Sequence, residues 1–519
     1  MTTSSPSSDV RAVPRAAVRI AGVEVASVLI PVRNPARTDQ VVGEVALGTA
    51  ADVDRAVDAA RAAFGRWSAT APMQRAERLR AAARQIAGRV DEIAEVLTLE
   101  QGKTLAESAI DVGGAARILD YYADLAGTLE HDEVFREDHR GTIYLGRRPM
   151  GVTGVIVPWN SPVYLALLGV APALIAGNPV VVKASEYAPL ALGMVLDILA
   201  DALPDGVVSS VPGDAEAGAA IARHPLIRKL FFTGSTKTGQ QVMRDAAGNL
   251  KSLSLELGGN DPAIILESAR ITDTLVDELV KGVFTTTGQI CFAVKRIYVH
   301  ESHYRDFLER FLAATATIVV GRGQDPRTTM GPLNNRPQFD RVQGLLDRIR
   351  ASGATLHTVG EQLDPTGWDS GLFVLPTVVT DVPPDAEIVT CEQFGPVIPV
   401  VSFADDDEVV AHANATEFGL AASVWTEDRA HALAVARCLE CGSVFVNVHR
   451  VGASDVSMPF GGFKMSGSGR GHGVPALHGC LEMQAIADYT DVSGFPDVRL
   501  VNRDAFENPA AEEVGHEPR

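Results

Sequence analysis

Two short motifs carry residue types that can act in turn on one carbonyl carbon. Glu256 begins a Glu-Leu-Gly-Gly motif, and Cys291, 35 residues later, ends a Gly-Gln-Ile-Cys motif. A cysteine thiolate can attack a carbonyl group, and a carboxylate can activate the water that later releases the product. The two motifs therefore favour covalent catalysis at a carbonyl group.

The position of each motif decides whether that chemistry is available. Over residues 252–257 leucines alternate with polar residues, so a strand there places Ser252, Ser254 and Glu256 on one face. Glu256 then lies at the carboxyl end of the strand, where open α/β sheets bind ligands. Cys291 follows a polar, glycine-containing segment and is expected on a loop. The alternatives are a solvated carboxylate and an inert buried thiol.

A side-chain amide is the third candidate for this chemistry. Asn160 ends a Pro-Trp-Asn segment that follows an apolar strand predicted over residues 152–157. An amide there can donate to a developing oxyanion, and such a donor is typically worth on the order of 100- to 1000-fold in rate. The alternative is an Asx turn before Pro162.

Two further segments suit a dinucleotide. Lys183 and Glu186 follow a strand predicted at residues 180–182, and both can bind ribose hydroxyls. Glu186 would repel a 2′-phosphate, which favours NAD over NADP. After a strand at residues 229–232, Ser235 is placed to cap a helix, and a helix N-terminus binds phosphate. This segment is neither a GxGxxG nor a Walker motif.

The apolar segments predict an α/β fold with two Rossmann-like parallel-sheet domains, because strands and helices alternate twice along the chain. The first series has strands at 152–157, 180–182, 207–211, 229–232 and 252–257, with helices that include 190–202 and 215–223. The second has strands at 263–265, 296–299, 397–402, 421–425 and 443–446, with helices at 272–284 and 304–314.

The remaining segments differ in character. Amphipathic patterns predict helices at residues 52–67, 74–99 and 105–125. Residues 131–148 are charged but include β-formers, which predicts a projecting hairpin. The two ends, residues 1–14 and 502–519, are expected to be flexible tails.

Composition limits the classes of partner and compartment. A net charge of −19 argues against nucleic acid and anionic membrane surfaces as partners. Five cysteines fit a reducing cytoplasm better than a disulfide framework, and no secretory signal is visible. Residues 149–182 carry no charge and could suggest a membrane span. Prolines and glycines interrupt them, so we expect strand, loop, helix and strand instead.

In order along the chain, the motifs PWN, KxSE, FTGSxxxG, ELGG, GQxC, ExFGP and PFGGxKxSG resemble those of the aldehyde dehydrogenase superfamily. The resemblance extends from about residue 30 to about residue 490 and fits the NAD(P)-dependent, non-acylating branch. It implies oxidation of a small aldehyde to a carboxylic acid with NAD. In that reaction Cys291 would be the nucleophile and Glu256 the general base. Asn160 would form the oxyanion hole with the Cys291 backbone N–H.

The resemblance also implies cofactor contacts and a domain plan. Lys183 and Glu186 would hold the adenine ribose, Gly234 and Ser235 the pyrophosphate, and Glu392 the nicotinamide ribose. The further cofactor contacts implied are Phe394, Gln338, Trp159 and Gly239. An NAD-binding domain would comprise residues 15–130 and 151–257, and a catalytic domain residues 258–475. Residues 131–150 and 480–498 would form an oligomerisation element of a homodimer or homotetramer.

The sequence departs from the family pattern at several positions. Ala184 stands where proline is usual, and Gly471 stands where a glutamate is common after Gly-Arg. Ser161 and Thr285 occupy positions where many members place aromatic residues along the substrate tunnel. The tunnel is therefore expected to be wider or more polar, and the resemblance does not identify the aldehyde.

Several alternatives stay open. A relative that transfers the acyl group to CoA is one, although Glu256 argues against it, and a catalytically silent scaffold on the same fold is another. Lys281 and Arg450 could favour an acidic aldehyde, or could simply be solvated. Cys438 and Cys441 form a CxxC pair without a second pair or a histidine at zinc spacing, so no metal is expected.

Overall fold

The structure is a computed structural model that describes residues 14–493 and residue 495. It divides into two compact units. The described part of the first unit comprises residues 14–130 and 148–482, and that of the second comprises residues 131–147, 483–493 and 495. The tails predicted at residues 1–14 and 502–519 lie outside the described residues, except for Pro14.

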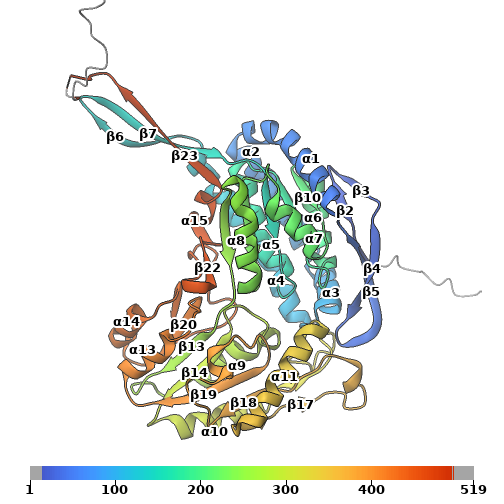
Figure 1. Ribbon diagram of the computed structural model, residues 1–519, viewed down its shortest axis with the longest axis vertical. Helices are drawn as coiled ribbons and strands as arrows, with labels where there is room; N and C mark the ends of the chain where they lie inside the picture. The colour runs from blue at the N-terminus through green and yellow to red at the C-terminus, as the bar shows by residue number, and fades with distance from the viewer. Residues whose placement is uncertain (1–13, 494, 496–519) are drawn as a thin grey trace, which may run out of the picture. The chain divides into compact units, whose positions relative to one another are not determined.

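An eight-stranded sheet in the first unit contains the first predicted strand series (Figure 1). Its order is β22-β12-β11-β8-β9-β10-β2-β3, and the five strands from β12 to β10 are parallel. These five are β12 Ser252–Glu256, β11 Lys229–Thr233, β8 Thr153–Ile156, β9 Val180–Lys183 and β10 Val208–Ser210. The antiparallel edge strands are β22 Gly467–Ser468, β2 Val18–Ile20 and β3 Val23–Val25. The prediction of a parallel sheet from alternating strands and helices is confirmed.

Helices cover both faces of this sheet because successive strand residues point to opposite sides. Val180 and Val182 pack in one core with α2 to α6, whereas Val181 packs in another with α1, α7 and α8. The helices are α1 Ala50–Ala69, α2 Pro72–Ala87, α3 Val90–Gln101, α4 Leu105–Asp124, α5 Pro162–Ala176, α6 Leu190–Ala202, α7 Ala215–Arg223 and α8 Thr236–Ala246. The uncharged stretch at 149–182 is β8, α5 and β9, as expected.

A seven-stranded sheet contains the second strand series, in the order β16-β18-β19-β14-β13-β20-β21. All its pairs are parallel except β16 with β18. The strands are β13 Asp261–Ile265, β14 Val294–His300, β16 Thr355–Thr358, β18 Thr377–Thr380, β19 Val397–Phe403, β20 Ala421–Trp425 and β21 Ser443–Val446. The accompanying helices are α9 Asp273–Phe284, α10 Tyr304–Thr315, α11 Arg336–Ser352, α12 Glu387–Thr390, α13 Asp406–Asn414 and α14 Arg429–Cys438. The last helix, α15 Gly473–His478, packs instead with α5 in the core of the eight-stranded sheet. The assignment of the two sheets to an NAD-binding and a catalytic domain stays a prediction.

Two expectations for the N-terminal region need correction. The single helix predicted at residues 74–99 is two helices, α2 and α3, because α2 ends at a C-cap on Gly88. Residues 15–47, where no strand was predicted, contain five strands. β2 and β3 join the eight-stranded sheet, and β1 Arg15–Ala16, β4 Val28–Asn34 and β5 Arg37–Leu47 form a three-stranded sheet. Pro31 interrupts the apolar run of β4 and β5 begins with polar residues, so neither has the regular alternation that marks a half-buried strand.

The second unit is built on the predicted hairpin. β6 Glu133–Asp138 and β7 Gly141–Pro149 pair antiparallel, and β23 Leu481–Tyr489 completes a three-stranded sheet in the order β23-β7-β6. Val134, Phe135 and Met483 expose more than half of their surface, at 54%, 64% and 64%. Within the described residues, no helix is both long enough and apolar enough to cross a bilayer.

Candidate active site

A single cavity of about 470 Å³ is lined by Asn160, Glu256 and Cys291. Asn160 follows β8 and precedes α5, Glu256 is the last residue of β12, and Cys291 lies between α9 and β14. The two strands contribute their carboxyl ends, where parallel sheets place ligands. The structure thus brings together three groups that the sequence had predicted to act on one carbonyl carbon, while their roles stay predictions.

The thiol of Cys291 is protonated at neutral pH in this arrangement. Its pKa is raised to about 12, chiefly by burial and in smaller part by the carboxylates of Glu256, Asp261 and Glu392, whereas the ammonium of Lys295 lowers it. A thiol with such a pKa is a weak nucleophile until it is deprotonated. Among the described residues, Lys295 is therefore the main group that favours the thiolate.

Lys295 is a functional candidate that the sequence analysis missed. Its side chain is 2% exposed, and its Nζ donates to the carbonyl oxygens of Ile290 (2.6 Å) and Cys291 (3.3 Å). Among the described residues no carboxylate lies within ion-pair distance of this Nζ. A buried cation without an ion-pair partner exerts a strong local field, because little water screens it. No local signal marks Lys295 in the sequence, because it is the second residue of a buried strand, β14, and belongs to no motif.

We expect Lys295→Met to slow the alkylation of Cys291 by iodoacetamide on the order of tenfold below the pKa of the thiol. Loss of the ammonium raises the thiol pKa, so the thiolate fraction at a given pH falls. The measurement is the alkylation rate as a function of pH. Lys251→Met is the matched control, because Lys251 is also buried and donates to two backbone carbonyls, those of Ala222 (2.6 Å) and His224 (2.9 Å). An unchanged pH profile for Lys295→Met would contradict the assignment.

Asn160 and the Cys291 backbone provide two donors at the cavity. The Asn160 side chain is 5% exposed, and its Nδ2 donates one hydrogen to the Gln289 carbonyl (2.9 Å). This contact links the amide to the loop of residues 285–291, called the cysteine loop below, and is not an Asx turn. The second Nδ2 hydrogen has no acceptor among the described residues, and neither has the Cys291 backbone N–H. Both are therefore available to an oxyanion.

The carboxyl group of Glu256 is buried and lacks hydrogen-bond partners. Neither of its oxygens has a partner among the described residues, and the nearby backbone of Gly471 leaves little room, because an added Cβ would lie 3.2 Å from Oε1. Burial raises the pKa of Glu256 to about 8, and the guanidinium of Arg470 opposes the shift. A carboxyl group with a pKa near neutrality is suited to act as a general base.

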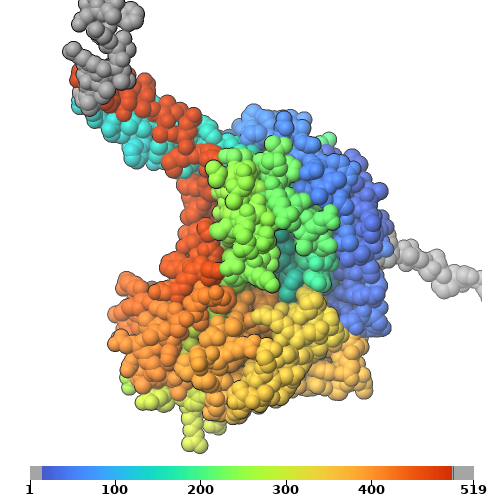
Figure 2. Space-filling model, viewed as in Figure 1, coloured from blue at the N-terminus to red at the C-terminus, as the bar shows by residue number. Residues whose placement is uncertain are grey.

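The candidates for the pyrophosphate and adenine ribose lie at the carboxyl ends of β11 and β9, the two strands on either side of β8. Ser235 caps α8 by accepting from the Thr238 backbone N–H (3.3 Å). In Figure 2, α8 lies at the surface beside the orange-red segment that contains Met465, whose carbonyl accepts from Thr236 Oγ1 (3.2 Å). Lys183 ends β9, 3.9 Å from Glu186, and burial lowers the pKa of Lys183 although Glu186 opposes the shift.

Glycines shape the segment between β11 and β12. The Gly234 backbone N–H donates to the Glu256 carbonyl (3.1 Å), which ties the turn after β11 to the end of β12. At Gly239 an added Cβ would lie 2.4 Å from the Leu257 side chain, so only glycine lets α8 pack this closely. The exposed cap of an 11-residue helix, next to a lysine and a glutamate on a nearby strand end, fits a dinucleotide.

The remaining cofactor candidates gather around Glu392. Its Oε1 accepts from the Gly259 backbone N–H (3.2 Å), and burial raises its pKa. Gln338 Nε2 donates to the Phe394 carbonyl (2.7 Å), and Trp159 packs edge-on against the Phe394 ring at 5.6 Å. Trp159 thus connects this group to Asn160, its neighbour in the chain.

Two cations and two thiols have ordinary partners. Lys281 and Arg450 both line the cavity, but both pair with Glu278, Lys281 at 3.2 Å and Arg450 at 2.5 Å. Cys438 Sγ contacts the Ala434 carbonyl and Cys441 Sγ the Ser443 carbonyl. No group of three or more His, Cys, Asp or Glu residues within the described ranges is arranged to hold a metal ion.

Comparison with known proteins decides the family. The model of the aldehyde dehydrogenase family matches residues 23–486, which is most of the chain. The chain belongs to the aldehyde dehydrogenase family. Among solved structures, a Burkholderia cenocepacia protein assigned to the aldehyde dehydrogenases is 35% identical with a TM-score of 0.89, over 93% of this chain and 99% of that one.

Two other similar aldehyde dehydrogenases were solved with NAD+ bound. The Bacillus cereus enzyme is 34% identical with a TM-score of 0.87, over 92% of this chain and 97% of its own. The Mycobacterium tuberculosis enzyme is also 34% identical with a TM-score of 0.87, over 92% and 98%. The mixed α/β architecture with parallel sheets is thus the fold of the family, as the sequence motifs predicted.

Proposed function

We propose that this aldehyde dehydrogenase converts an aldehyde to a carboxylic acid with NAD, through a thiohemiacetal and then a thioester on Cys291. The observation that supports this most strongly is the shared cavity of Asn160, Glu256 and Cys291. A nucleophile, an oxyanion donor and a buried base around one space are what acyl chemistry at a carbonyl requires.

In the first half of the reaction, the Cys291 thiolate forms a bond to the aldehyde carbon and the carbonyl electrons move to oxygen. The free Nδ2 hydrogen of Asn160 and the Cys291 backbone N–H donate to the resulting oxyanion. Bound NAD supplies the hydride acceptor for the hydrogen on that carbon. Loss of this hydrogen with its electron pair restores the carbonyl bond and leaves a thioester on Cys291.

In the second half, Glu256 accepts a proton from water while the water oxygen attacks the thioester carbon. The carbon–sulfur bond then breaks, the Cys291 thiolate is restored, and the carboxylic acid leaves. The CoA-acylating alternative uses a thiol as acyl acceptor and needs no water-activating base. The buried, unpartnered Glu256 at the cavity therefore favours hydrolysis.

Cofactor binding rests on the residues described above. Glu186 beside Lys183 favours NAD, because a 2′-phosphate would be repelled by the carboxylate. The α8 N-terminus would hold the pyrophosphate, and Glu392 would bind the nicotinamide ribose. The two similar enzymes that bind NAD+ support the same choice of cofactor here.

The cavity walls favour an aldehyde with an apolar body. Phe292 packs edge-on against Phe460, with ring centroids 5.5 Å apart, and Phe460 stacks on His472 at 5.2 Å. Burial lowers the pKa of His472 to about 4, so this ring is neutral at physiological pH. Because Glu278 offsets one of the two charges of Lys281 and Arg450, the attraction for an acidic aldehyde is reduced.

We expect NADH formation with NAD and hexanal in the absence of CoA, and faster oxidation of hexanal than of succinate semialdehyde. The apolar walls and the shared Glu278 give the physical reason. The measurement is absorbance at the NADH band with a panel of aliphatic, aromatic and acidic aldehydes, with and without CoA. A requirement for CoA would favour the acylating reaction, and no NADH with any aldehyde would favour a silent scaffold.

We also propose that the enzyme is a homodimer or homotetramer assembled through the sheet of β6, β7 and β23. Strands at the edges of a sheet seek a partner edge, and this sheet exposes Val134, Phe135 and Met483. Sedimentation of the purified protein would test this, and a monomer at micromolar concentration would contradict it.

A further inference from the structure

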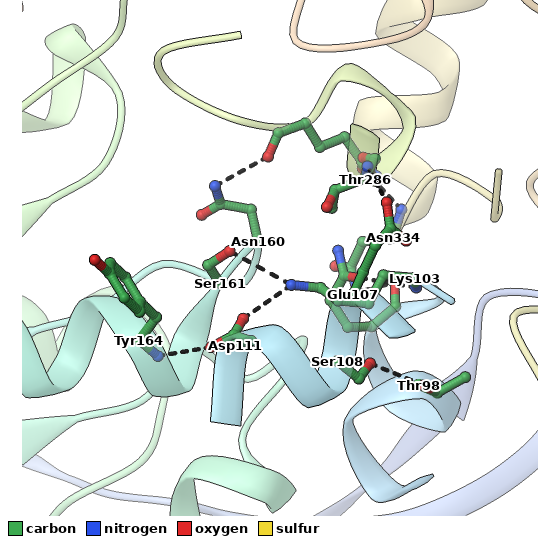
Figure 3. A network of polar contacts seen from close by, with 12 residues as sticks. Thr98, Lys103, Glu107, Ser108, Asp111, Asn160, Ser161, Tyr164, Thr286 and Asn334 are labelled. Carbon is green, nitrogen blue, oxygen red and sulfur yellow. Dashed lines mark hydrogen bonds and ion pairs between the residues drawn. The ribbon is translucent and has the colours of Figure 1, made fainter. Parts of the chain in front are cut away.

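One face of α4 contacts the two segments of the chain that carry the proposed oxyanion donors. Glu107 and Asp111 are four residues apart and therefore lie one above the other on the helix. Figure 3 shows Glu107 directed toward Thr286 on the cysteine loop and Asp111 directed toward Tyr164 beside Asn160. Both carboxylates line the same cavity as Cys291.

Glu107 has two separate functions at its two oxygens. Oε2 accepts from the Thr104 backbone N–H (2.8 Å) and the Thr104 hydroxyl (2.9 Å), which completes a capping box at the start of α4. Oε1 accepts from the Thr286 backbone N–H at 2.6 Å. The second contact is not needed for capping, so it ties α4 to the loop before Cys291.

The backbone of the cysteine loop is strained. Thr286, Thr287 and Gly288 are consecutive residues with positive φ angles of 52°, 59° and 70°. A non-glycine residue in this region costs on the order of 1–2 kcal/mol, so the two threonines would relax if they were free. The Glu107 contact holds Thr286, and Thr287 Oγ1 donates to the Gly331 carbonyl (2.9 Å).

The strained segment is linked directly to Asn160. Gln289 Nε2 donates to the Thr286 carbonyl (3.1 Å), and the Gln289 carbonyl accepts from Asn160 Nδ2 (2.9 Å). A change at Thr286 therefore reaches both the oxyanion amide and, two residues after Gln289, the nucleophile.

Asp111 contacts the segment that follows Asn160. Its Oδ1 accepts from the backbone N–H of Tyr164 (2.7 Å), which lies in the first turn of α5, four residues after Asn160. Its Oδ2 pairs with Lys103 Nζ (2.9 Å), and both side chains are almost fully buried, at 3% and 2% exposure. The same Nζ donates to Ser161 Oγ (3.4 Å).

We propose that Glu107 and Asp111 are positioning residues that use α4 as a rigid spacer between the cysteine loop and the segment from Asn160 to Tyr164. The role rests on the proposed function, because it fixes the separation of the thiol and the oxyanion donors. Two carboxylates on adjacent helical turns set this separation more firmly than loop contacts alone, since a helix resists bending. Neither residue needs to touch the substrate.

Glu107→Asp is the decisive variant, because the chain itself shows that aspartate can serve in the same capping box. At the start of α1, Thr49 is the N-cap residue and Asp52 is the third helical residue, and the two make the same reciprocal contacts. Aspartate at position 107 therefore keeps the cap on Thr104 but is one methylene too short to reach Thr286. The expected result is a kcat lower by about 10- to 100-fold, the scale of an ångström-sized misplacement. KM for NAD should change by less than about twofold, because the cofactor contacts lie elsewhere.

Thr104→Ala is the complementary control for Glu107→Asp. It removes the hydroxyl of the capping box but leaves the Glu107 contact with Thr286, so it should lower the melting temperature by a few degrees while kcat stays within about twofold. If Thr104→Ala lost as much activity as Glu107→Asp, the loss would follow from helix capping, and the positioning role would be wrong.

A double-mutant cycle with Asn160→Ala tests the route of action. If Glu107 acts through the Asn160–Cys291 geometry, Glu107→Asp should lower kcat by less than about threefold once Asn160 is gone. An undiminished effect in the Asn160→Ala background would overturn the proposal.

Alkylation of Cys291 by iodoacetamide separates this proposal from the proposed function, because it requires no turnover. Loosening of the loop should make the partly exposed thiol more accessible and speed alkylation of Glu107→Asp by about threefold or more. Equal rates in the wild type and Glu107→Asp would refute the positioning role even if aldehyde oxidation were confirmed. A wild type without aldehyde oxidation would refute the function alone.

Discussion

Replacement of Cys291 by alanine is expected to reduce aldehyde-dependent NADH formation to background. Cys291 is the one cysteine among the described residues that line the cavity, and in the proposed mechanism its thiol forms the covalent bond on which both halves of the reaction depend. Loss of a nucleophile from a covalent mechanism typically costs at least about 10⁴-fold in kcat. The cofactor candidates lie on other segments, so binding of NAD should persist and can be measured by its quenching of tryptophan fluorescence.

Cys438→Ala is the matched control for this prediction. Cys438 is exposed on α14, with its Sγ against the Ala434 carbonyl, and it does not line the cavity. It should retain wild-type activity. Full activity in Cys291→Ala would remove the proposed mechanism. If the Cys291→Ala protein neither folds nor binds NAD, Cys291→Ser is the alternative variant, because serine preserves size and polarity. It should show the same loss of activity.

The convergence of Asn160, Glu256 and Cys291 on one cavity was predictable because each residue stands at a recognisable boundary. Glu256 ends an alternating strand, Asn160 follows an apolar strand, and Cys291 follows a helix and a polar turn. Period-2 patterns and glycine turns are local signals, and parallel topology then brings strand ends to one edge. Local pattern and topology together therefore sufficed to place these three candidates at one cavity, while their roles stay predictions.

The groups that tune and hold the site were not predictable in the same way. Lys295 is the second residue of the strand β14 and Glu107 belongs to an ordinary capping box, so their local patterns indicate only structure. Their contacts with the cysteine loop become visible only in three dimensions, and Glu107 lies 179 residues from Thr286. β4 and β5 were missed for a local reason, because Pro31 interrupts the apolar run of β4 and β5 begins with polar residues.

Glu256→Gln is expected to separate the two halves of the reaction. Glutamine keeps the size of the side chain but cannot accept a proton from water, so the thioester should form and then hydrolyse slowly. Rapid mixing with NAD and aldehyde should show a burst of about one NADH per active site, followed by a steady rate lower by about 10²- to 10⁴-fold. The burst should survive because Asn160 and the Cys291 backbone N–H are unchanged.

The pH dependence gives this assignment an independent test. Burial raises the pKa of Glu256 to about 8, so the carboxyl is mostly protonated below pH 8 and inactive as a base. Where hydrolysis limits turnover, the steady rate of the wild type should rise with pH through about 8, and this rise should disappear in Glu256→Gln. Loss of the burst in a variant that still binds NAD would place Glu256 in thioester formation instead. A wild-type rate that falls between pH 7 and 9 would show that the ionised carboxylate is not the base, because a base with this pKa gains activity as it loses its proton.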